Sequence, residues 1–342
     1  MSLNDEIAAQ PEIAERLLRE APEQLRPLVA AVRGRGITHV VIAARGTSDH
    51  AAIYAQYVLG ALGGLPVALA APSLFTRYAS PPRVGDALVI GISQSGRSPD
   101  VVAVVEEARR QGAVTTVVTN DASSPLAAAA EHRLDLRAGA ERSVAATKTY
   151  TAELMVIAML AVALSDDAEG RAALAGVPDA QRAALRLADR AAALADDRAG
   201  LADCVVLGRG FNLATAHEWA LKLKELAYVR AQAYSSADFQ HGPVASLAPG
   251  ADVLAIVARG PLAADAVGLV ERLRSERRAR ILLLAGDALP GIDHLGFPDD
   301  LPEWVSPLVD IIPAQLFVAA LARAKDLDVE HPRGLHKVTL TR

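Results

Sequence analysis

The sequence predicts an α/β fold of two similar subdomains, each a doubly wound parallel sheet flanked by helices. Continuous Val/Ile runs, typical of strands buried on both faces, alternate with amphipathic helical stretches over residues 36–165, and the same alternation returns over 200–325. "RGTS", which begins at Arg45, and "RGFN", which begins at Arg209, follow the first strand of each half. This correspondence indicates an internal duplication.

Six strands can be placed along the chain. Those expected in the first half are "THVVIAA" from Thr38, "DALVIG" from Asp86 and "VTTVVT" from Val114. Those expected in the second half are "DCVVLG" from Asp203, "ADVLAIV" from Ala251 and "RILLLAG" from Arg280. Amphipathic helices between the strands would cover both faces of each sheet.

Three further segments lie outside the two repeats. Residues 1–35 have helical periodicity, and residues 166–199 form an Ala/Asp/Arg-rich helical connector. Residues 326–342 form a C-terminal tail, which we expect to close the active site. The first segment is too short to hold a DNA-binding domain and a linker.

Composition excludes several classes of function. With 342 residues and a net charge of −5, the chain has the length for a large core but no basic footprint for nucleic acid. The single cysteine, Cys204, lies in an apolar run, which predicts a core role in a reduced, cytoplasmic protein. The N-terminus is too charged for a signal peptide. The apolar run "LMVIAMLAVAL" is too short to cross a bilayer, so we expect a buried or interface helix and no membrane association.

The stretch "GISQSGRSPD", residues 91–100, predicts a phosphate site at the carboxyl end of a strand. Ser98 suits the N-cap of the next helix, and Pro99 suits its first turn. The helix dipole and the hydroxyls of Ser93, Ser95 and Ser98 would favour an anion. A polar loop without a ligand is the alternative. This is neither a P-loop nor a dinucleotide-binding fingerprint.

The loop after the first strand forms a second wall of the expected site. Thr47 and Ser48 in "RGTSDH" are placed to reach sugar hydroxyls. A structural role is equally open, because either residue would serve as the N-cap of the following helix.

The helix "HEWALKLKELAY" carries Glu218, Lys222 and Glu225 at positions i, i+4 and i+7, on one face. A solvated salt-bridge face is the ordinary interpretation of such a stripe. Shortly afterwards, "SADFQHGPV" places His241 in a loop. A carboxylate, a histidine and a lysine together suit aldose–ketose isomerisation. The scattered histidines, and the lack of a second histidine after "HE", argue against a metal site.

Five stretches together resemble a known family: "RGTSDH", "SQSGRSPD", "AERSVAATKTY", "ALKLKELAYVRAQAYSSADFQHGP" and "HPRGLHKVTL". They resemble the double sugar isomerase (SIS) domain family, in particular the isomerase half of glutamine–fructose-6-phosphate aminotransferase. The resemblance covers nearly the whole chain and implies two flavodoxin-like SIS subdomains. Arg45 stands where that half has a cysteine, and Ala146 where it has a serine.

The resemblance also implies roles for individual residues. Ser93, Gln94, Ser95 and Ser98 would hold the phosphate, and Ser48 with backbone near Val144 would bind the sugar. Glu225 would carry a proton between C1 and C2, His241 would assist ring opening, and Lys337 would contact the open-chain carbonyl or imine. Glu218 and Lys222 would orient Glu225 electrostatically. In the family the histidine comes from the neighbouring subunit, which implies a homodimer, and no metal or organic cofactor is needed.

The glutaminase domain of that aminotransferase and its N-terminal cysteine have no counterpart in this sequence. We therefore expect an isomerising deaminase that converts glucosamine 6-phosphate and water to fructose 6-phosphate and ammonia. Alternatives are galactosamine 6-phosphate or fructosamine 6-phosphates as substrates, or an aminotransferase-like activity. A non-catalytic sugar-phosphate sensor is the alternative from another class.

Overall fold

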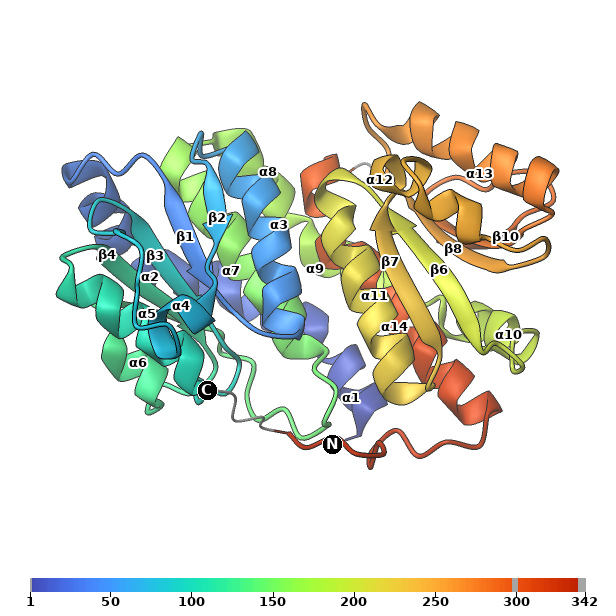
Figure 1. The fold of residues 1–342 in the computed structure, drawn as a ribbon, viewed down its shortest axis with the longest axis horizontal. Coiled ribbons are helices and arrows are strands. Elements are labelled where there is room, and N and C mark those ends of the chain that lie inside the picture. The colour runs from blue at the N-terminus through green and yellow to red at the C-terminus, as the bar shows by residue number, and fades with distance from the viewer. Residues whose placement is uncertain (1, 297–300, 338–342) are drawn as a thin grey trace. The chain divides into compact units, whose positions relative to one another are not determined.

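The computed structural model describes residues 2–296 and 301–337, and it divides into two compact units (Figure 1). The first-sheet unit comprises residues 12–141 and 148–175 with residues 336–337 of the tail. The second-sheet unit comprises the described residues among 2–11, 142–147 and 176–335. Each unit is therefore assembled from separate stretches of chain.

The first-sheet unit is built on a five-stranded parallel sheet in the order β2-β1-β3-β4-β5. The strands are β1 (Val40–Ala43), β2 (Val67–Leu69), β3 (Leu88–Ile92), β4 (Val114–Thr119) and β5 (His132–Asp135). The order of strands reverses between β1 and β3, which pair in parallel with Val40 opposite Leu88. Ligands of doubly wound sheets bind at the carboxyl ends of strands at such a switch point.

Helices complete this unit. They are α2 (Gln10–Gly34), α3 (Thr47–Ala61), α4 (Pro72–Thr76), α5 (Pro99–Arg110), α6 (Pro125–Ala129), α7 (Lys148–Ser165) and α8 (Ala168–Ala175). The valines of α5, among them Val101, Val104 and Val105, pack on Val89 and Val117 of the sheet. The spacing of these valines along the helix puts them on one face, and that face packs on the sheet.

The second-sheet unit repeats the same topology. Its strands are β6 (Asp203–Gly208), β7 (Arg230–Ser235), β8 (Asp252–Val257), β9 (Arg280–Ala285) and β10 (Asp293–Leu295). All pair in parallel in the order β10-β9-β8-β6-β7. Numbered within each unit, both sheets have the flavodoxin-like order 2-1-3-4-5. The α/β fold with two similar halves is confirmed.

The helical elements of this unit, in chain order, are α1 (Leu3–Ala8), α9 (Val177–Leu185), α10 (Ala188–Asp196), η1 (Gly210–Asn212), α11 (Leu213–Leu226), α12 (Ser236–Gln240), η2 (Pro243–Ser246), α13 (Ala263–Arg277), η3 (Glu303–Val305) and α14 (Pro307–Ala324). The stretch expected as a connector, 166–199, forms α8 in the first-sheet unit and α9 and α10 in the second.

Two helices, α7 and α14, are long and apolar enough to cross a membrane by length and composition alone. Their apolar windows are 83% and 78% buried inside the protein. Core helices of soluble proteins have this same character. The run "LMVIAMLAVAL" lies in α7, where Leu154 to Val162 are buried, so the expected buried helix is confirmed.

Cys204 on β6 is buried, as its apolar context predicts. Burial, with the nearby Asp252 and Asp203, raises the pKa of the thiol to about 12. Because the thiolate is the reactive species, we expect a thiol reagent at pH 8 to leave the folded protein unmodified and to react with one thiol per chain after denaturation. Rapid reaction of the native protein would contradict this placement.

Candidate active site

Two loops meet the switch point of the first sheet. Residues 44–46 connect β1 to α3, and residues 93–98 connect β3 to α5. Both loops follow the carboxyl ends of neighbouring strands, since β1 and β3 are paired. The predicted phosphate loop and its second wall therefore share one edge of the sheet.

The serine loop is held firmly by backbone hydrogen bonds. The Ser93 N–H donates to Val118 O on β4 (3.0 Å), and the Gln94 carbonyl accepts from Asn120 N–H (3.1 Å). Gly96 has φ of +61°, and a Cβ there would lie 2.1 Å from Ser124 Oγ. Only glycine fits this turn.

The hydroxyls of this loop differ in their partners. Ser93 Oγ accepts from Gly96 N–H (3.2 Å), and Ser95 Oγ accepts from Arg97 N–H (3.3 Å). Ser98 is the N-cap of α5 and Pro99 follows it, as expected, but the Ser98 side chain makes no capping hydrogen bond. Among the residues that the structure describes, none bonds to the Ser98 hydroxyl, so it can donate to a ligand. All three oxygens can take part in anion binding, since each hydroxyl hydrogen can turn toward a phosphate.

A buried carboxylate lies beside this loop. Asp100 in the first turn of α5 is 1% exposed, and Arg45 Nε donates to its Oδ2 at 2.7 Å. The pair joins the two loops of the switch point and offsets the negative charge of Asp100 next to the expected phosphate site. This contact gives Arg45, the departure from the family's cysteine, a structural role. The structure gives no account of Ala146.

The second wall is not built as a helix cap. The residue before α3 is Gly46, with φ of +56°, so neither Thr47 nor Ser48 is the N-cap; both lie in the first turn. Ser48 is 7% exposed and its hydroxyl donates to Glu153 Oε1 on α7 at 2.8 Å. Its oxygen still offers an acceptor, whereas the capping interpretation of Thr47 and Ser48 is wrong.

The double variant Ser95→Ala with Ser98→Ala tests the phosphate loop. We expect its affinity for fructose 6-phosphate to fall at least about tenfold, because hydrogen bonds to a charged group are worth about 1.5–3 kcal/mol each. Isothermal titration calorimetry measures the change, and Ser275→Ala on the exposed face of α13 is the matched control. Unchanged affinity in the double variant would remove the loop from the binding site.

Lys337 in the tail belongs to the first-sheet unit. Its Nζ lies 3.3 Å from Glu141 Oε2, and the Glu141 side chain is fully buried. Glu141 also accepts from the N–H and hydroxyl of Thr149 at the start of α7. Glu141 was not among the predicted site residues, because its contact with Lys337 spans 196 residues and leaves no local pattern in the sequence.

The acid–base–acid stripe on α11 is buried. Glu218 and Lys222 are 0% and 1% exposed, and the Glu225 side chain is 22% exposed. Lys222 Nζ lies 3.2 Å from Glu218 Oε1 and 2.6 Å from Glu225 Oε2. The solvated salt-bridge face considered for this pattern is therefore wrong, because the helix packs this side into the unit.

The opposite charges of the lysine and the two carboxylates compensate for the burial of this cluster. Burial alone would lower the pKa of Lys222, but the carboxylates of Glu218 and Glu225 outweigh burial and raise the pKa above its ordinary value. A protonated Lys222 between two carboxylates holds Glu225 in place. Of the three groups, only Glu225 has an exposed edge from which to exchange a proton with a ligand.

His241 lies at the C-cap of α12, and its ring is exposed. Its backbone N–H donates to Asp238 O (3.0 Å). Among the described residues, no side chain hydrogen-bonds to the imidazole. The structure of one chain therefore leaves this ring open to solvent rather than joining it to the α11 cluster.

The segment that carries Val144 is fixed by a residue that sequence analysis did not identify. Glu6 on α1 is fully buried, and its carboxylate accepts from the N–H groups of Arg142 (2.6 Å) and Ser143 (3.3 Å). Glu6 thus sets the backbone immediately before Val144, which is half-buried.

The predicted site residues fall into two groups. The first-sheet unit contains Thr47, Ser48, Ser93, Gln94, Ser95, Ser98 and Lys337; the second-sheet unit contains Val144, Glu218, Lys222, Glu225 and His241. Within residues 2–296 and 301–337, no group of three or more His, Cys, Asp or Glu side chains is arranged to hold a metal ion.

Known proteins are similar to this chain in sequence and in fold. A family model described as the SIS domain matches residues 35–163. A crystal structure of a candidate phosphosugar isomerase from Silicibacter pomeroyi DSS-3 is 34% identical, with a TM-score of 0.88, over 96% of this chain and 99% of that one. The chain belongs to the SIS family of phosphosugar isomerases. The resemblance to this family is confirmed.

Two further relatives refine the comparison. Glutamine–fructose-6-phosphate aminotransferase (isomerizing) from Thermosynechococcus vestitus is 34% identical in an alignment of 323 positions that covers 88% of this SIS chain and 51% of the relative. The chain thus spans about half the length of the curated relatives it matches. The C-terminal domain of glucosamine-fructose-6-phosphate aminotransferase from Francisella tularensis has the same fold, with a TM-score of 0.86 at 24% identity over 96% of this chain and 98% of that domain.

Proposed function

We propose that the protein is an isomerising deaminase of an amino sugar phosphate, with glucosamine 6-phosphate as the substrate. The observation that carries this proposal is the buried Glu218–Lys222–Glu225 cluster, in which one carboxylate keeps an exposed edge. Such a carboxylate suits proton transfer between adjacent carbons. The 34% identity to an aminotransferase named for fructose 6-phosphate supports the substrate class.

The reaction proceeds in three steps. The ring opens to the 2-amino aldehyde, with His241 assisting proton transfer to and from the ring oxygen and the C1 hydroxyl. Glu225 removes the proton from C2 and returns it to C1, while a proton passes from the C2 amine to the C1 oxygen, which leaves a hydroxyl at C1 and an imine at C2. Water then adds to the imine carbon and ammonia departs, giving fructose 6-phosphate. The ammonium of Lys337 stabilises the negative charge that develops on the oxygen at C1 during proton transfer.

The serine loop holds the phosphate in this proposal. Ser93, Gln94, Ser95 and Ser98 surround it at the start of α5, where the helix dipole favours an anion. Ser48 and the backbone near Val144 bind sugar hydroxyls.

The assembly and location follow the same proposal. We propose a homodimer in which His241 acts in the partner subunit, supported by the exposure of its ring. The proposed enzyme acts in the cytoplasm. It uses neither a metal nor an organic cofactor and does not bind nucleic acid.

Ammonia release tests the function directly. Purified protein is given glucosamine 6-phosphate, galactosamine 6-phosphate or a fructosamine 6-phosphate, each without glutamine, and ammonia and fructose 6-phosphate are measured. Equal amounts of both products from glucosamine 6-phosphate alone support the proposal. Release only from another substrate would correct the sugar, and binding without release would favour a sensor.

A further inference from the structure

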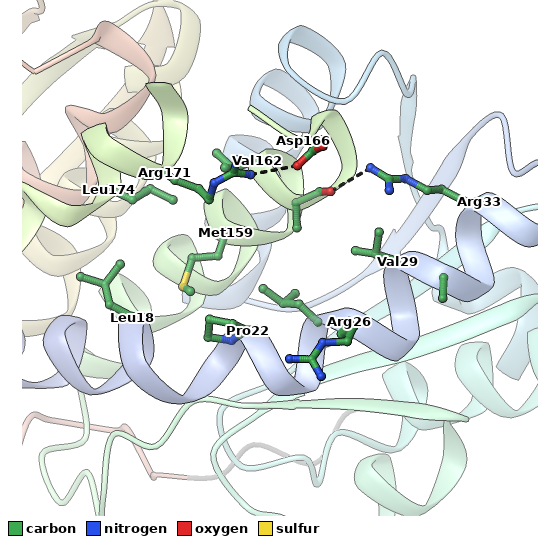
Figure 2. A pocket seen from close by; sticks show the side chains of 13 residues that line it. Leu18, Pro22, Arg26, Val29, Arg33, Met159, Val162, Asp166, Arg171 and Leu174 are labelled. Atoms are coloured by element: carbon green, nitrogen blue, oxygen red, sulfur yellow. Dashed lines mark hydrogen bonds and ion pairs between the residues drawn. The ribbon is translucent and has the colours of Figure 1, made fainter. Parts of the chain in front are cut away.

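The first-sheet unit contains a hollow formed by α2 on one side and α7 and α8 on the other (Figure 2). Its volume is about 590 Å³. Binding sites for small molecules are typically about 300–1,000 Å³ and mostly apolar. None of the predicted site residues lines this cavity.

The walls are apolar because the hydrophobic face of α2 is wide. Leu17 and Leu28 on this face are buried in the unit. Leu18, Pro22 and Val29, further round the same face, line the cavity opposite Met159 and Val162 of α7. An apolar surface of this size favours an apolar ligand.

The polar groups at the edge are mainly guanidinium groups. Arg33 donates to the carbonyl oxygens of Ala163 (3.2 Å) and Leu164 (3.1 Å), and Arg171 pairs with Asp166 at 3.1 Å. Arg26 has neither a hydrogen bond nor an ion pair with any described residue. With three arginines and one carboxylate at the edge, the cavity has excess positive charge although the whole chain carries −5.

We propose that this cavity binds an amphipathic carboxylate, a molecule with an apolar chain and one terminal carboxylate. The apolar chain of this ligand lies between α2 and α7, and its carboxylate pairs with Arg26. A guanidinium group matches the planar geometry of a carboxylate and forms charge-assisted hydrogen bonds with it. This site is separate from the serine loop and does not depend on the proposed deaminase activity.

Calorimetric titration with decanoate, kept below its micelle-forming concentration, tests the site. We expect saturable binding of one molecule per chain, unaffected by saturating fructose 6-phosphate. Arg26→Gln should weaken binding about tenfold, as loss of one charge-assisted bond predicts. Ala30→Trp, which places a large side chain in the cavity from an exposed helix position, should abolish it.

Two controls distinguish binding in this cavity from nonspecific binding of a charged or apolar ligand to the protein surface. Arg19→Gln, on α2 but outside the cavity, should bind decanoate as the unmodified protein does, and decylamine should bind far more weakly than decanoate. Equal weakening by Arg19→Gln, or equal binding of decylamine, would overturn the proposal. So would the absence of decanoate binding together with dissociation of a dimer by Ala30→Trp, since the cavity would then be an interface between copies.

Discussion

Replacing Glu225 with Gln is expected to lower kcat for ammonia release by about 10²–10⁴, the usual contribution of a positioned general base. The amide keeps the size of the side chain but cannot accept the C2 proton. Lys222 keeps Glu218 as an ion-pair partner at 3.2 Å, so the helix remains intact. Steady-state assays with glucosamine 6-phosphate measure the loss of turnover.

Binding must survive in this variant for the proton-transfer role to hold. The affinity of Glu225→Gln for fructose 6-phosphate, measured by calorimetry, should stay within about threefold of the unmodified protein, since the phosphate loop is untouched. Glu271→Gln, on an exposed position of α13, is the matched control and should retain full activity. Turnover retained by Glu225→Gln would assign the proton transfer to another group.

The strands that sequence analysis identified are the six central ones. Each is a buried Val/Ile/Leu-rich run, as in β3 and β4, where every residue is buried. The four strands that it did not identify, β2, β5, β7 and β10, are the edges of the two sheets. An edge strand pairs on one side only, so polar sequences such as "RAQAYS" in β7 carry no hydrophobic signal.

In the candidate site, too, the features set by local sequence were predictable and those set by distant contacts were not. Spacing along one helix predicted that Glu218, Lys222 and Glu225 share a face, and the β3–α5 loop was placed correctly. Burial of that face was not predictable from the spacing, because it depends on packing by distant segments. The contacts of Arg45 with Asp100 and of Ser48 with Glu153 join residues 55 and 105 positions apart, for which local pattern holds no information.

Lys222→Met is expected to have the largest effect on stability. Lys222 is buried between Glu218 and Glu225, and removing one partner of a buried ion pair costs about 3–5 kcal/mol, because the two carboxylates lose the positive charge that lies between them. Urea unfolding at neutral pH measures the loss of free energy. Lys224→Met, on the exposed side of the same helix, is the control and should change stability by less than about 0.5 kcal/mol.

Two further measurements separate the charge from the shape of the lysine. Adding Glu218→Gln to Lys222→Met removes one of the two facing carboxylates, so the double variant should regain part of the lost stability; no recovery would show that packing rather than charge is the cause. The pKa of Lys222 is raised on folding, so its stabilisation is complete below the unfolded pKa of about 10.4 and declines as pH rises through the folded pKa. The difference in stability between the unmodified protein and Lys222→Met should therefore shrink in strongly alkaline solution, whereas a difference that is constant with pH would rule out the ion pair as its source.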